Sequence, residues 1–347
     1  MKKAALSSLT TFSMIEADIP NIESGNDVLL KVSTAGICGS DIHYFQSGRI
    51  GNQIINYPFT PGHEFTGTIA DIGSTVKELK PGDRVAIDPA ISCGHCDQCR
   101  ANRSHTCRNL KFIGNPAELE GCLQEYIVLP AKCCFKLPES ISLKDGVVIE
   151  PLTIALHALD FMTKGGDIAV LGCGPIGLST LYALKARTEN RNILMTDKIE
   201  ARLEFAKSKG ADWTGNPSQN DIVNEVSKIL PLGVDTVFEC CGEEDAIYQA
   251  CEMLKPGGQL IIIGIPEQDT IALDFHTLRR KEITINNVRR QNDKFKEAIK
   301  TMRSEQIDLN GFITHSFSIE QTQSAFETVA TYSDGVLKAI IQIDVNP

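Results

Sequence analysis

The chain has 347 residues with 44 acidic and 34 basic side chains, which gives a formal net charge of −10 at pH 7, and 42% of its residues are hydrophobic. This length predicts about two domains, each large enough for its own hydrophobic core. Dispersed basic residues in an acidic chain argue against nucleic acid or an acidic membrane surface as a partner, because both are bound through positive charge. No apolar run approaches the roughly 18 residues of a membrane span.

The N-terminus and the cysteines both indicate a cytoplasmic protein. Polar residues from Ser7 to Ser13 interrupt the apolar stretch after Lys3, so a first strand explains this start better than a signal peptide does. Four of the 12 cysteines are closely grouped. Without an export signal, such grouping favours reduced thiols that bind a metal over disulfides.

Two patterns follow each other along the chain. Up to about residue 150, Pro-Gly pairs separate short strands, which predicts a β-rich domain; its strands are expected at 27–33, 67–72 and 84–87. Farther on, helical stretches alternate with apolar runs and predict an α/β domain with a doubly wound parallel sheet; its strands are expected at 168–171, 193–196, 236–239 and 259–263. A helix at 294–303 and later strands are expected to return to the first domain.

A glycine-rich turn follows the apolar run at 168–171 and opens a helical pattern. It has the form G-x-G-x-x-G and consists of Gly172, Cys173, Gly174, Pro175, Ile176 and Gly177. Glycines there permit a tight turn and close approach to a pyrophosphate at the helix N-terminus. The next strand ends at Asp197, 20 residues after Gly177, where a carboxylate would bind the ribose hydroxyls. The two features together favour a dinucleotide site over an ordinary strand-turn-helix.

Asp197 also predicts which dinucleotide is used. A carboxylate accepts hydrogen bonds from a 2′-hydroxyl and repels a 2′-phosphate, so NAD is favoured over NADP. Lys198 and Arg202 are basic residues close by in the sequence. Arg202 is expected to lie along the adenosine rather than to bind a phosphate.

Four cysteines form a C-x2-C-x2-C-x7-C loop and are Cys93, Cys96, Cys99 and Cys107. Four thiolates brought together locally suit a closed, tetrahedral zinc site. An iron–sulfur cluster is the alternative, but in a ferredoxin run the fourth cysteine follows after three residues and precedes proline. Here seven residues intervene and Arg108 follows, so zinc is favoured.

A second group of possible metal ligands is dispersed along the chain. It comprises Cys38, the pair His63 and Glu64, and Glu150 before Pro151. Taken singly, each has an ordinary explanation as a buried thiol, a hydrogen-bonded core histidine or a surface carboxylate. Only a pattern that links them indicates a metal site.

That pattern is a family resemblance over essentially the whole chain. The run Gly62-His63-Glu64-x2-Gly67-x5-Gly73-x2-Val76 resembles the zinc signature of the medium-chain alcohol dehydrogenase superfamily. The runs CGSDIHY at 38–44, GRIG at 48–51 and IEPL at 149–152 resemble its sorbitol (L-iditol 2-) and xylitol dehydrogenase branch. The resemblance implies a GroES-like catalytic domain at 1–155 and 290–347, a Rossmann NAD-binding domain at 156–289, and an active site in the cleft between them.

The resemblance also implies roles for individual residues. Cys38, His63 and Glu64 match ligands of a catalytic zinc, Glu150 matches a carboxylate that touches the ion directly or through water, and the loop cysteines would hold a second, structural zinc. Ser40 and His43 match a path that carries the substrate proton to solvent. The remaining matches are Tyr44, Glu150 and Arg290 toward the substrate, and Arg202, Ile263, Ile265, Val288 and Arg290 toward the cofactor.

The sequence thus predicts a zinc-dependent dehydrogenase that transfers hydride from a secondary hydroxyl of a polyol to NAD. Arg289 and Gln291 flank Arg290 where relatives commonly have aromatic residues, so a polyol phosphate, a cyclic polyol and L-threonine stay open as substrates. A non-enzymatic zinc-ribbon binding module is favoured only by the cysteine loop, and a zinc-free quinone reductase would lack that loop and Cys38. Relatives are commonly tetramers or dimers, which implies a homo-oligomer.

Overall fold

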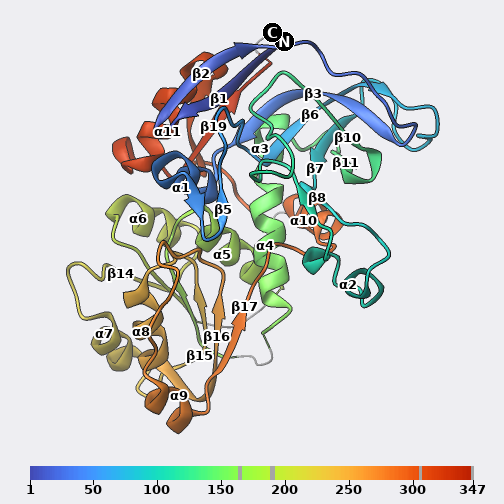
Figure 1. The fold of residues 1–347 in the computed structure, drawn as a ribbon. Helices are drawn as coiled ribbons and strands as arrows, with labels where there is room; N and C mark the ends of the chain where they lie inside the picture. Colours follow the sequence, from blue (N-terminus) through green and yellow to red (C-terminus); the bar gives the residue numbers. More distant parts are fainter. Residues whose placement is uncertain (163–165, 188–191, 305–306, 345–347) are drawn as a thin grey trace. The chain divides into compact units, whose positions relative to one another are not determined.

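The structure is a computed structural model that describes residues 1–162, 166–187, 192–304 and 307–344 (Figure 1). The chain divides into two compact units. The first contains the described residues of Met1–Glu150, Phe295–Arg303 and Phe312–Pro347, and the second those of Pro151–Lys294 and Ser304–Gly311.

The sequence predicted domain boundaries at 155/156 and 289/290, whereas the units of the structure meet at 150/151 and 294/295. One further segment is also assigned differently. The described residues of Ser304–Gly311 belong to the second unit, although residues on both sides of this segment belong to the first. Asp308 explains the difference, because its carbonyl accepts a hydrogen bond from the Tyr182 hydroxyl (2.6 Å) and its carboxylate pairs with Lys209 (2.6 Å).

A seven-stranded sheet forms the centre of the first unit. Its order is β11-β7-β6-β3-β19-β18, and β10 also pairs with β3. Along β3, Val28, Leu30 and Val32 are buried and alternate with half-buried residues, as expected for a strand with one face on a core. The strand bounds are β3 (Asp27–Gly36), β6 (Glu64–Ile72), β7 (Arg84–Ile87), β10 (Tyr126–Pro130), β11 (Cys134–Lys136), β18 (Ile313–Ser318) and β19 (Lys338–Gln342).

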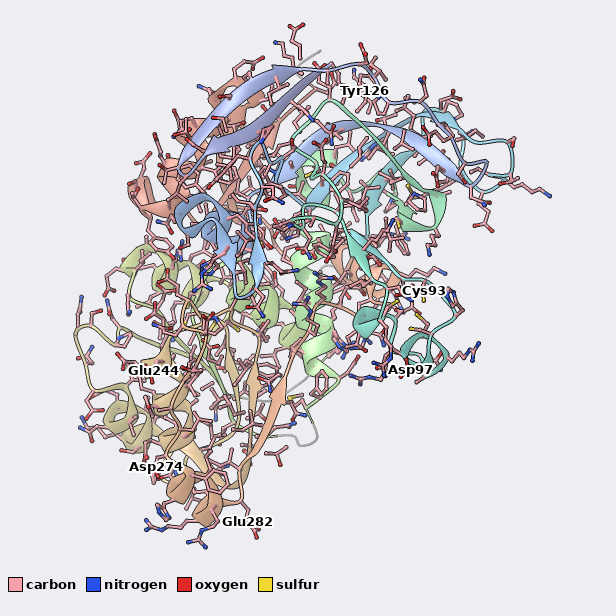
Figure 2. All side chains as sticks on the ribbon, viewed as in Figure 1. Cys93, Asp97, Tyr126, Glu244, Asp274 and Glu282 are labelled. Carbon is pink, nitrogen blue, oxygen red and sulfur yellow. The ribbon has the colours of Figure 1, made fainter. Side chains whose placement is uncertain are left out.

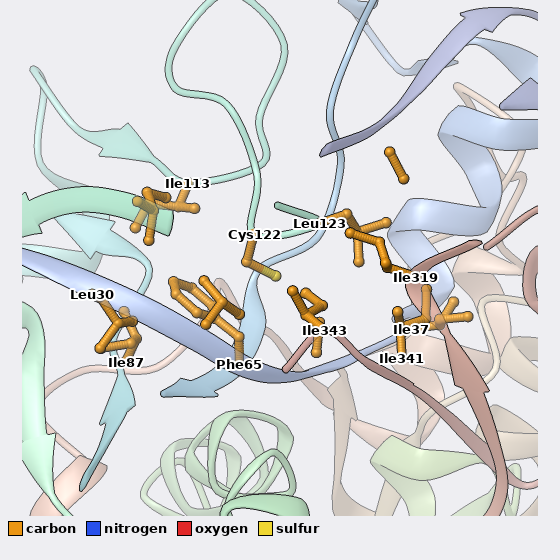
Figure 3. Packing of buried hydrophobic residues seen from close by; sticks show 14 of the residues in the cluster. Leu30, Ile37, Phe65, Ile87, Ile113, Cys122, Leu123, Ile319, Ile341 and Ile343 are labelled. Atoms are coloured by element: carbon orange, nitrogen blue, oxygen red, sulfur yellow. The ribbon is translucent and has the colours of Figure 1, made fainter. Parts of the chain in front are cut away.

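Small hairpins and short helices complete the first unit. The hairpins are β1 (Lys2–Ser8) with β2 (Thr11–Glu16), and β4 (Arg49–Ile50) with β5 (Gln53–Ile54). A further two-stranded sheet pairs β8 (Ala90–Ile91) with β9 (Lys111–Phe112) across the cysteine loop. The helices are α1 (Gly39–Ser47), α2 (Asp97–Arg100), α3 (Leu143–Gly146), α10 (Phe295–Met302) and α11 (Thr322–Ala330). The core gathers apolar side chains from distant parts of the chain, among them Leu30, Phe65, Cys122, Leu123 and Ile341 (Figure 3).

The second unit is built on a six-stranded parallel sheet with the order β14-β13-β12-β15-β16-β17. Numbered from β12 this is the order 3-2-1-4-5-6 of a doubly wound dinucleotide-binding sheet. The strands are β12 (Ile168–Leu171), β13 (Ile193–Thr196), β14 (Trp213–Gly215), β15 (Val234–Glu239), β16 (Leu254–Ile262) and β17 (Thr284–Asn287). The helices are α4 (Ile149–Leu159), which begins in the first unit, α5 (Pro175–Arg187), α6 (Glu200–Ser208), α7 (Ile222–Ile229), α8 (Glu244–Met253) and α9 (Phe275–Lys281).

The predicted fold class is confirmed. All four residues of β12 are buried, as the apolar run at 168–171 predicts for an inner parallel strand. The helix expected at 294–303 is α10, and it returns to the first unit together with β18 and β19. None of the described helices combines the length and apolar character needed to cross a membrane.

Candidate metal centres and dinucleotide site

Three dispersed residues meet in the first unit. Cys38 is the N-cap of α1, His63 directly precedes β6, and Glu64 is the first residue of β6. Their ligand atoms all lie within 4.8 Å of one another. The sheet brings them together because β3, which leads to Cys38, pairs with β6.

Asp41 connects this group, and the sequence interpretation gave it no role. Its carboxylate is completely buried and accepts hydrogen bonds from the backbone N–H groups of Cys38 (3.0 Å) and Gly62 (3.2 Å). The same carboxylate lies 3.5 Å from His63 Nδ1. A carboxylate on one ring nitrogen fixes the orientation of a histidine and leaves Nε2 for a metal.

In this group, positive and negative side chains stabilise each other's charged forms. Burial lowers the pKa of His63, but the negative charges of Asp41 and Cys38 outweigh it and raise that pKa well above its usual value. Lys338 of β19 is also buried and pairs with Glu64. Burial disfavours its ammonium, yet Glu64 and Cys38 raise the Lys338 pKa.

Glu150, in the first turn of α4, belongs to the same electrostatic group. Burial raises its pKa to about 8, while His63 lowers and Glu64 raises it. A buried carboxylate that is costly to ionise gains most from a nearby divalent cation. The donor set of one thiolate, one imidazole and carboxylates is the kind that a catalytic zinc uses, so these residues fit the ion.

The other residues predicted near this group lie on or next to α1. Ser40 and His43 are half-buried and three positions apart, which places them on the same face of the helix. Tyr44 lies in the core at 2% exposure, and its hydroxyl is 3.4 Å from Asn115 Oδ1. Arg49 is exposed and donates to the Gly51 carbonyl (3.1 Å). A substrate contact by Tyr44 therefore stays a prediction.

The four loop cysteines lie together around α2. The Sγ–Sγ distances are 3.6 Å for Cys96–Cys99, 3.8 Å for Cys96–Cys107 and 4.0 Å for Cys93–Cys99. These values exclude a disulfide and match the roughly 3.8 Å edge of a tetrahedron with Zn–S distances of about 2.3 Å. Arg108 forms a bidentate ion pair with Asp97 and ties the loop from outside. Figure 2 shows Asp97 close to Cys93.

The pKa values of the loop thiols are also consistent with a bound cation. A hydrogen bond from the His95 backbone lowers the pKa of Cys93 to about 6. Desolvation and the neighbouring thiols raise the pKa of Cys99 to about 11. Four thiolates this close repel one another, and a divalent cation removes that repulsion, so the loop fits a structural zinc.

The three glycines of the dinucleotide turn have different reasons to be glycine. Gly172 has φ +101°, and a Cβ at Gly177 would lie 1.8 Å from the Gly172 carbonyl oxygen. For Gly174 the nearest described atom to such a Cβ is Arg202 Nη1 at 3.7 Å, an ordinary contact. The chain itself therefore does not require glycine at 174, whereas a dinucleotide lying against this backbone would.

Asp197 directly follows β13 and holds the glycine turn. Its Oδ2 accepts a hydrogen bond from Cys173 N–H (2.7 Å), and its Oδ1 accepts one from Ile199 N–H (2.8 Å). Arg202 is buried beside the turn, whereas Lys198 is exposed and pairs with Glu243 (3.3 Å). These residues lie at the carboxyl ends of β12 and β13, where doubly wound sheets bind their ligands.

The residues predicted near the nicotinamide lie at the ends of β16 and β17. The backbone N–H groups of Ile263 and Val288 are already used by the carbonyls of Glu239 (2.8 Å) and Ile262 (2.8 Å). Ile265 is 44% exposed. Because the N–H groups of Ile263 and Val288 are already in use, a nicotinamide carboxamide would bind to the carbonyl groups of these residues and to the Ile265 N–H.

Arg290 is half-buried and has φ +54°, a conformation that is uncommon for a residue other than glycine. Its neighbour Arg289 is exposed. Gln291 is buried, and its Oε1 accepts a hydrogen bond from Lys294 N–H (2.8 Å). Gln291 therefore holds its own loop, and the two arginines supply the positive charge there.

Among the described residues, three buried Asp, Glu or Lys side chains were not singled out by the sequence interpretation: Asp41, Lys338 and Glu239. Each had a sequence signal. Asp41 stands three residues after the helix N-cap, where a capping side chain is common. Lys338 interrupts the apolar run 336–341, and Glu239 ends an apolar strand before a cysteine pair and a glycine. In the structure, Glu239 Oε1 accepts hydrogen bonds from Cys241 N–H (2.8 Å) and Gly242 N–H (2.7 Å).

Two family models match the chain. The alcohol dehydrogenase GroES-like domain matches residues 24–139, and the zinc-binding dehydrogenase model matches residues 175–304. Sorbitol dehydrogenase of Bacillus subtilis is 34% identical over 98% of this chain and 97% of its own length. L-idonate 5-dehydrogenase of Vitis vinifera is 36% identical over 88% of this chain and 85% of its own length.

A solved structure agrees with these relatives. Galactitol-1-phosphate dehydrogenase of Escherichia coli superimposes with a TM-score of 0.90 at 28% identity, covering 99% of this chain and 100% of that chain. The chain is therefore a zinc- and NAD(P)-dependent oxidoreductase with a GroES-like and a Rossmann-type domain, and it belongs to the zinc-binding alcohol dehydrogenase family, in its polyol dehydrogenase branch.

Proposed function

We propose that this protein oxidises a secondary hydroxyl of an open-chain polyol to a ketone and transfers the hydride to NAD. The observation that carries the proposal is the meeting of the Cys38, His63 and Glu64 ligand atoms within 4.8 Å in a chain that also holds a dinucleotide turn. The relatives support the substrate class, because sorbitol, L-idonate and galactitol 1-phosphate are all open chains with several hydroxyl groups.

The reaction needs two groups that the chain binds. A zinc ion lowers the pKa of a bound alcohol, and NAD accepts the hydride from the carbon, so that a ketone, NADH and one proton are formed. Cys38, His63 and Glu64 would hold the catalytic ion, with Glu150 beside it. The cysteines Cys93, Cys96, Cys99 and Cys107 would hold a second ion, which makes two zinc ions per chain.

The chain's own residues would carry the proton. Ser40 lies in the first turn of α1, two residues after the N-cap Cys38, and His43 lies three residues farther along the same face. One helical turn of about 5.4 Å is a distance that a single water or ribose hydroxyl can bridge. We propose that the Ser40 hydroxyl accepts the proton of the substrate hydroxyl while it donates its own, and that the His43 imidazole passes this proton on to solvent.

A substrate comparison tests the proposed function. We expect kcat/KM with NAD to be higher for sorbitol or xylitol than for ethanol by about 100-fold or more, because polar groups left without partners cost about 1–3 kcal/mol each. Initial rates of NADH formation would be measured for these substrates, an inositol, a hexitol phosphate and L-threonine. Ethanol as the best substrate would contradict the polyol proposal.

A polyol phosphate is the second candidate. The adjacent Arg289 and Arg290 favour it, since guanidinium groups bind phosphate oxygens well. A relative that acts on galactitol 1-phosphate also supports it. A hexitol phosphate that exceeds its unphosphorylated parent in the same comparison would move the assignment to this substrate class.

Cofactor choice is expected to depend on Asp197. Asp197→Ala should lower kcat/KM for NAD by about tenfold or more and reduce the preference over NADP, because it removes a charged acceptor for ribose hydroxyls and a charge that repels phosphate. Quenching of Trp213 fluorescence by each dinucleotide gives the binding constants independently of turnover. Lys198→Ala is the control, since its ammonium pairs with exposed Glu243. A wild-type enzyme that prefers NADP would contradict this role of Asp197.

We also propose a cytoplasmic homo-oligomer, a dimer or tetramer. Among the described residues, β17 pairs with β16 alone and leaves one edge of the six-stranded sheet open to another chain. Light scattering would measure the mass in solution.

A further inference from the structure

Lys338 is a charged residue in the middle of the sheet of the first unit. Its relative exposure is 1%, and it lies on β19 between β3 and β18. The ammonium donates a hydrogen bond to the Ile37 carbonyl (3.0 Å) and forms an ion pair with Glu64 Oε2. Burial of an ammonium is costly, and leucine or methionine would fill the same space without a charge. The ion pair therefore suggests a function beyond packing.

Gly36 provides the room for this pair. It ends β3 and is the register partner of Glu64 on one side and of Ile340 on the other. A Cβ at Gly36 would lie 2.4 Å from Glu64 Oε2 and 3.0 Å from Lys338 Cε. The lysine thus reaches Glu64 across a strand position that has no side chain.

The contact makes the two oxygens of Glu64 unequal. Oε2 is bonded to the ammonium, so Oε1 is the oxygen that can approach an ion without displacing Lys338. A carboxylate can otherwise bind a metal through both oxygens. A catalytic zinc needs a coordination position left open for substrate, and a second oxygen from Glu64 would take one.

We propose that Lys338 is a positioning residue that restricts Glu64 to one oxygen at the metal site and so preserves a position for the substrate hydroxyl. The inference rests on the proposed function, in which Cys38, His63 and Glu64 hold the catalytic zinc.

The sign of one substitution distinguishes this role from plain structural support. Lys338→Met keeps an unbranched apolar stem and removes the ammonium. Three effects then strengthen zinc binding: a cation no longer repels the ion, Oε2 becomes available, and the metal-free protein is left with a buried carboxylate that has lost its partner. A lysine that only supported packing would loosen the site when replaced, and zinc would bind more weakly.

The experiment measures zinc affinity of the full chain by competition with a chromophoric chelator, with metal analysis to account for the loop ion. We expect Lys338→Met to bind the catalytic zinc about tenfold or more tightly than the wild type. Lys338→Arg keeps the charge and should stay within about threefold of the wild type. With Co²⁺ in place of zinc, the Met variant should show weaker d–d absorption, as expected when the coordination number rises.

Lys31→Met is the matched control. Lys31 lies on β3 of the same sheet and pairs with Asp344 (2.8 Å), but it is partly exposed and far less enclosed than Lys338. Neither its zinc affinity nor its Co²⁺ spectrum should change. If Lys338→Met does not fold, Lys338→Gln removes the same charge while keeping a hydrogen-bond donor and is expected to shift affinity in the same direction.

Weaker zinc binding, or an unchanged affinity and Co²⁺ spectrum, in a folded Lys338→Met or Lys338→Gln protein overturns the proposal. A wild-type protein that binds only the loop ion would instead overturn the proposed function. The two failures are therefore distinguishable.

Discussion

Replacing Cys38 with serine is expected to remove one of two zinc ions per chain and to lower kcat/KM for the best polyol by about a thousandfold or more, equivalent to about 4 kcal/mol of transition-state stabilisation. Cys38 supplies the thiolate of the three-residue group, and a serine hydroxyl is a much weaker zinc ligand. Elemental analysis counts the ions, and NADH formation gives the rates.

Cys122→Ser is the control for this experiment. Cys122 is a completely buried thiol of the same core (Figure 3). A Cβ at Gly62 would lie 2.8 Å from its Sγ. It is outside the ligand group, so the variant should keep two ions and most of its activity. Iron in place of zinc, or full activity of the wild type with a single ion, would contradict the assignment of two zinc sites.

Replacing Cys96 with serine is expected to act on stability. The Cys96 sulfur lies 3.6 Å from Cys99 Sγ and 3.8 Å from Cys107 Sγ, so the loop loses a central ligand. Structural zinc contributes its binding free energy to folding, and we expect a loss of about 3 kcal/mol or more, which lowers Tm by about 6–12 °C for a unit of 150–250 residues. Calorimetry and metal analysis would measure both effects.

Cys134→Ser provides the comparison, because Cys134 is also a half-buried cysteine of the first unit but lies on β11, outside both ligand groups. It should retain two ions and a Tm close to that of the wild type. A Cys96→Ser protein that keeps the loop ion, or that loses the catalytic ion first, would show that the loop is not a separate structural site.

Local spacing predicted the parts of the molecule whose residues are close in sequence. The glycine turn, Asp197 and the four-cysteine loop each lie within a short stretch, so their chemistry is visible without a fold. Strand ends were less accurate: the strand expected at 259–263 runs from Leu254 to Ile262, because pairing with β15 extends it. Burial of a strand depends on its neighbours in the sheet, which a local pattern does not contain.

The proposed catalytic group shows more clearly what a local sequence pattern cannot predict. Cys38, His63 and Glu64 were linked only through a family pattern, since 24 residues lie between Cys38 and His63. Lys338 lies still farther along the chain and reaches Glu64 only because β19 inserts beside β3 and Gly36 lacks a side chain. Such a contact is a product of sheet order and register. An alternation of apolar and polar residues therefore could not have predicted it.

The position of β19 also has a consequence for biosynthesis. β19 fills a place in the middle of the first sheet, between β3 and β18, yet it is translated after residues 151–294 of the second unit. On the ribosome, the parallel sheet of the second unit can form while the first sheet still lacks an inner strand. Until residues 338–342 emerge, the end of β3 that pairs with β19 stays an open strand edge and Glu64 lacks its lysine partner, so the first unit is prone to wrong strand pairing for as long as these residues are untranslated.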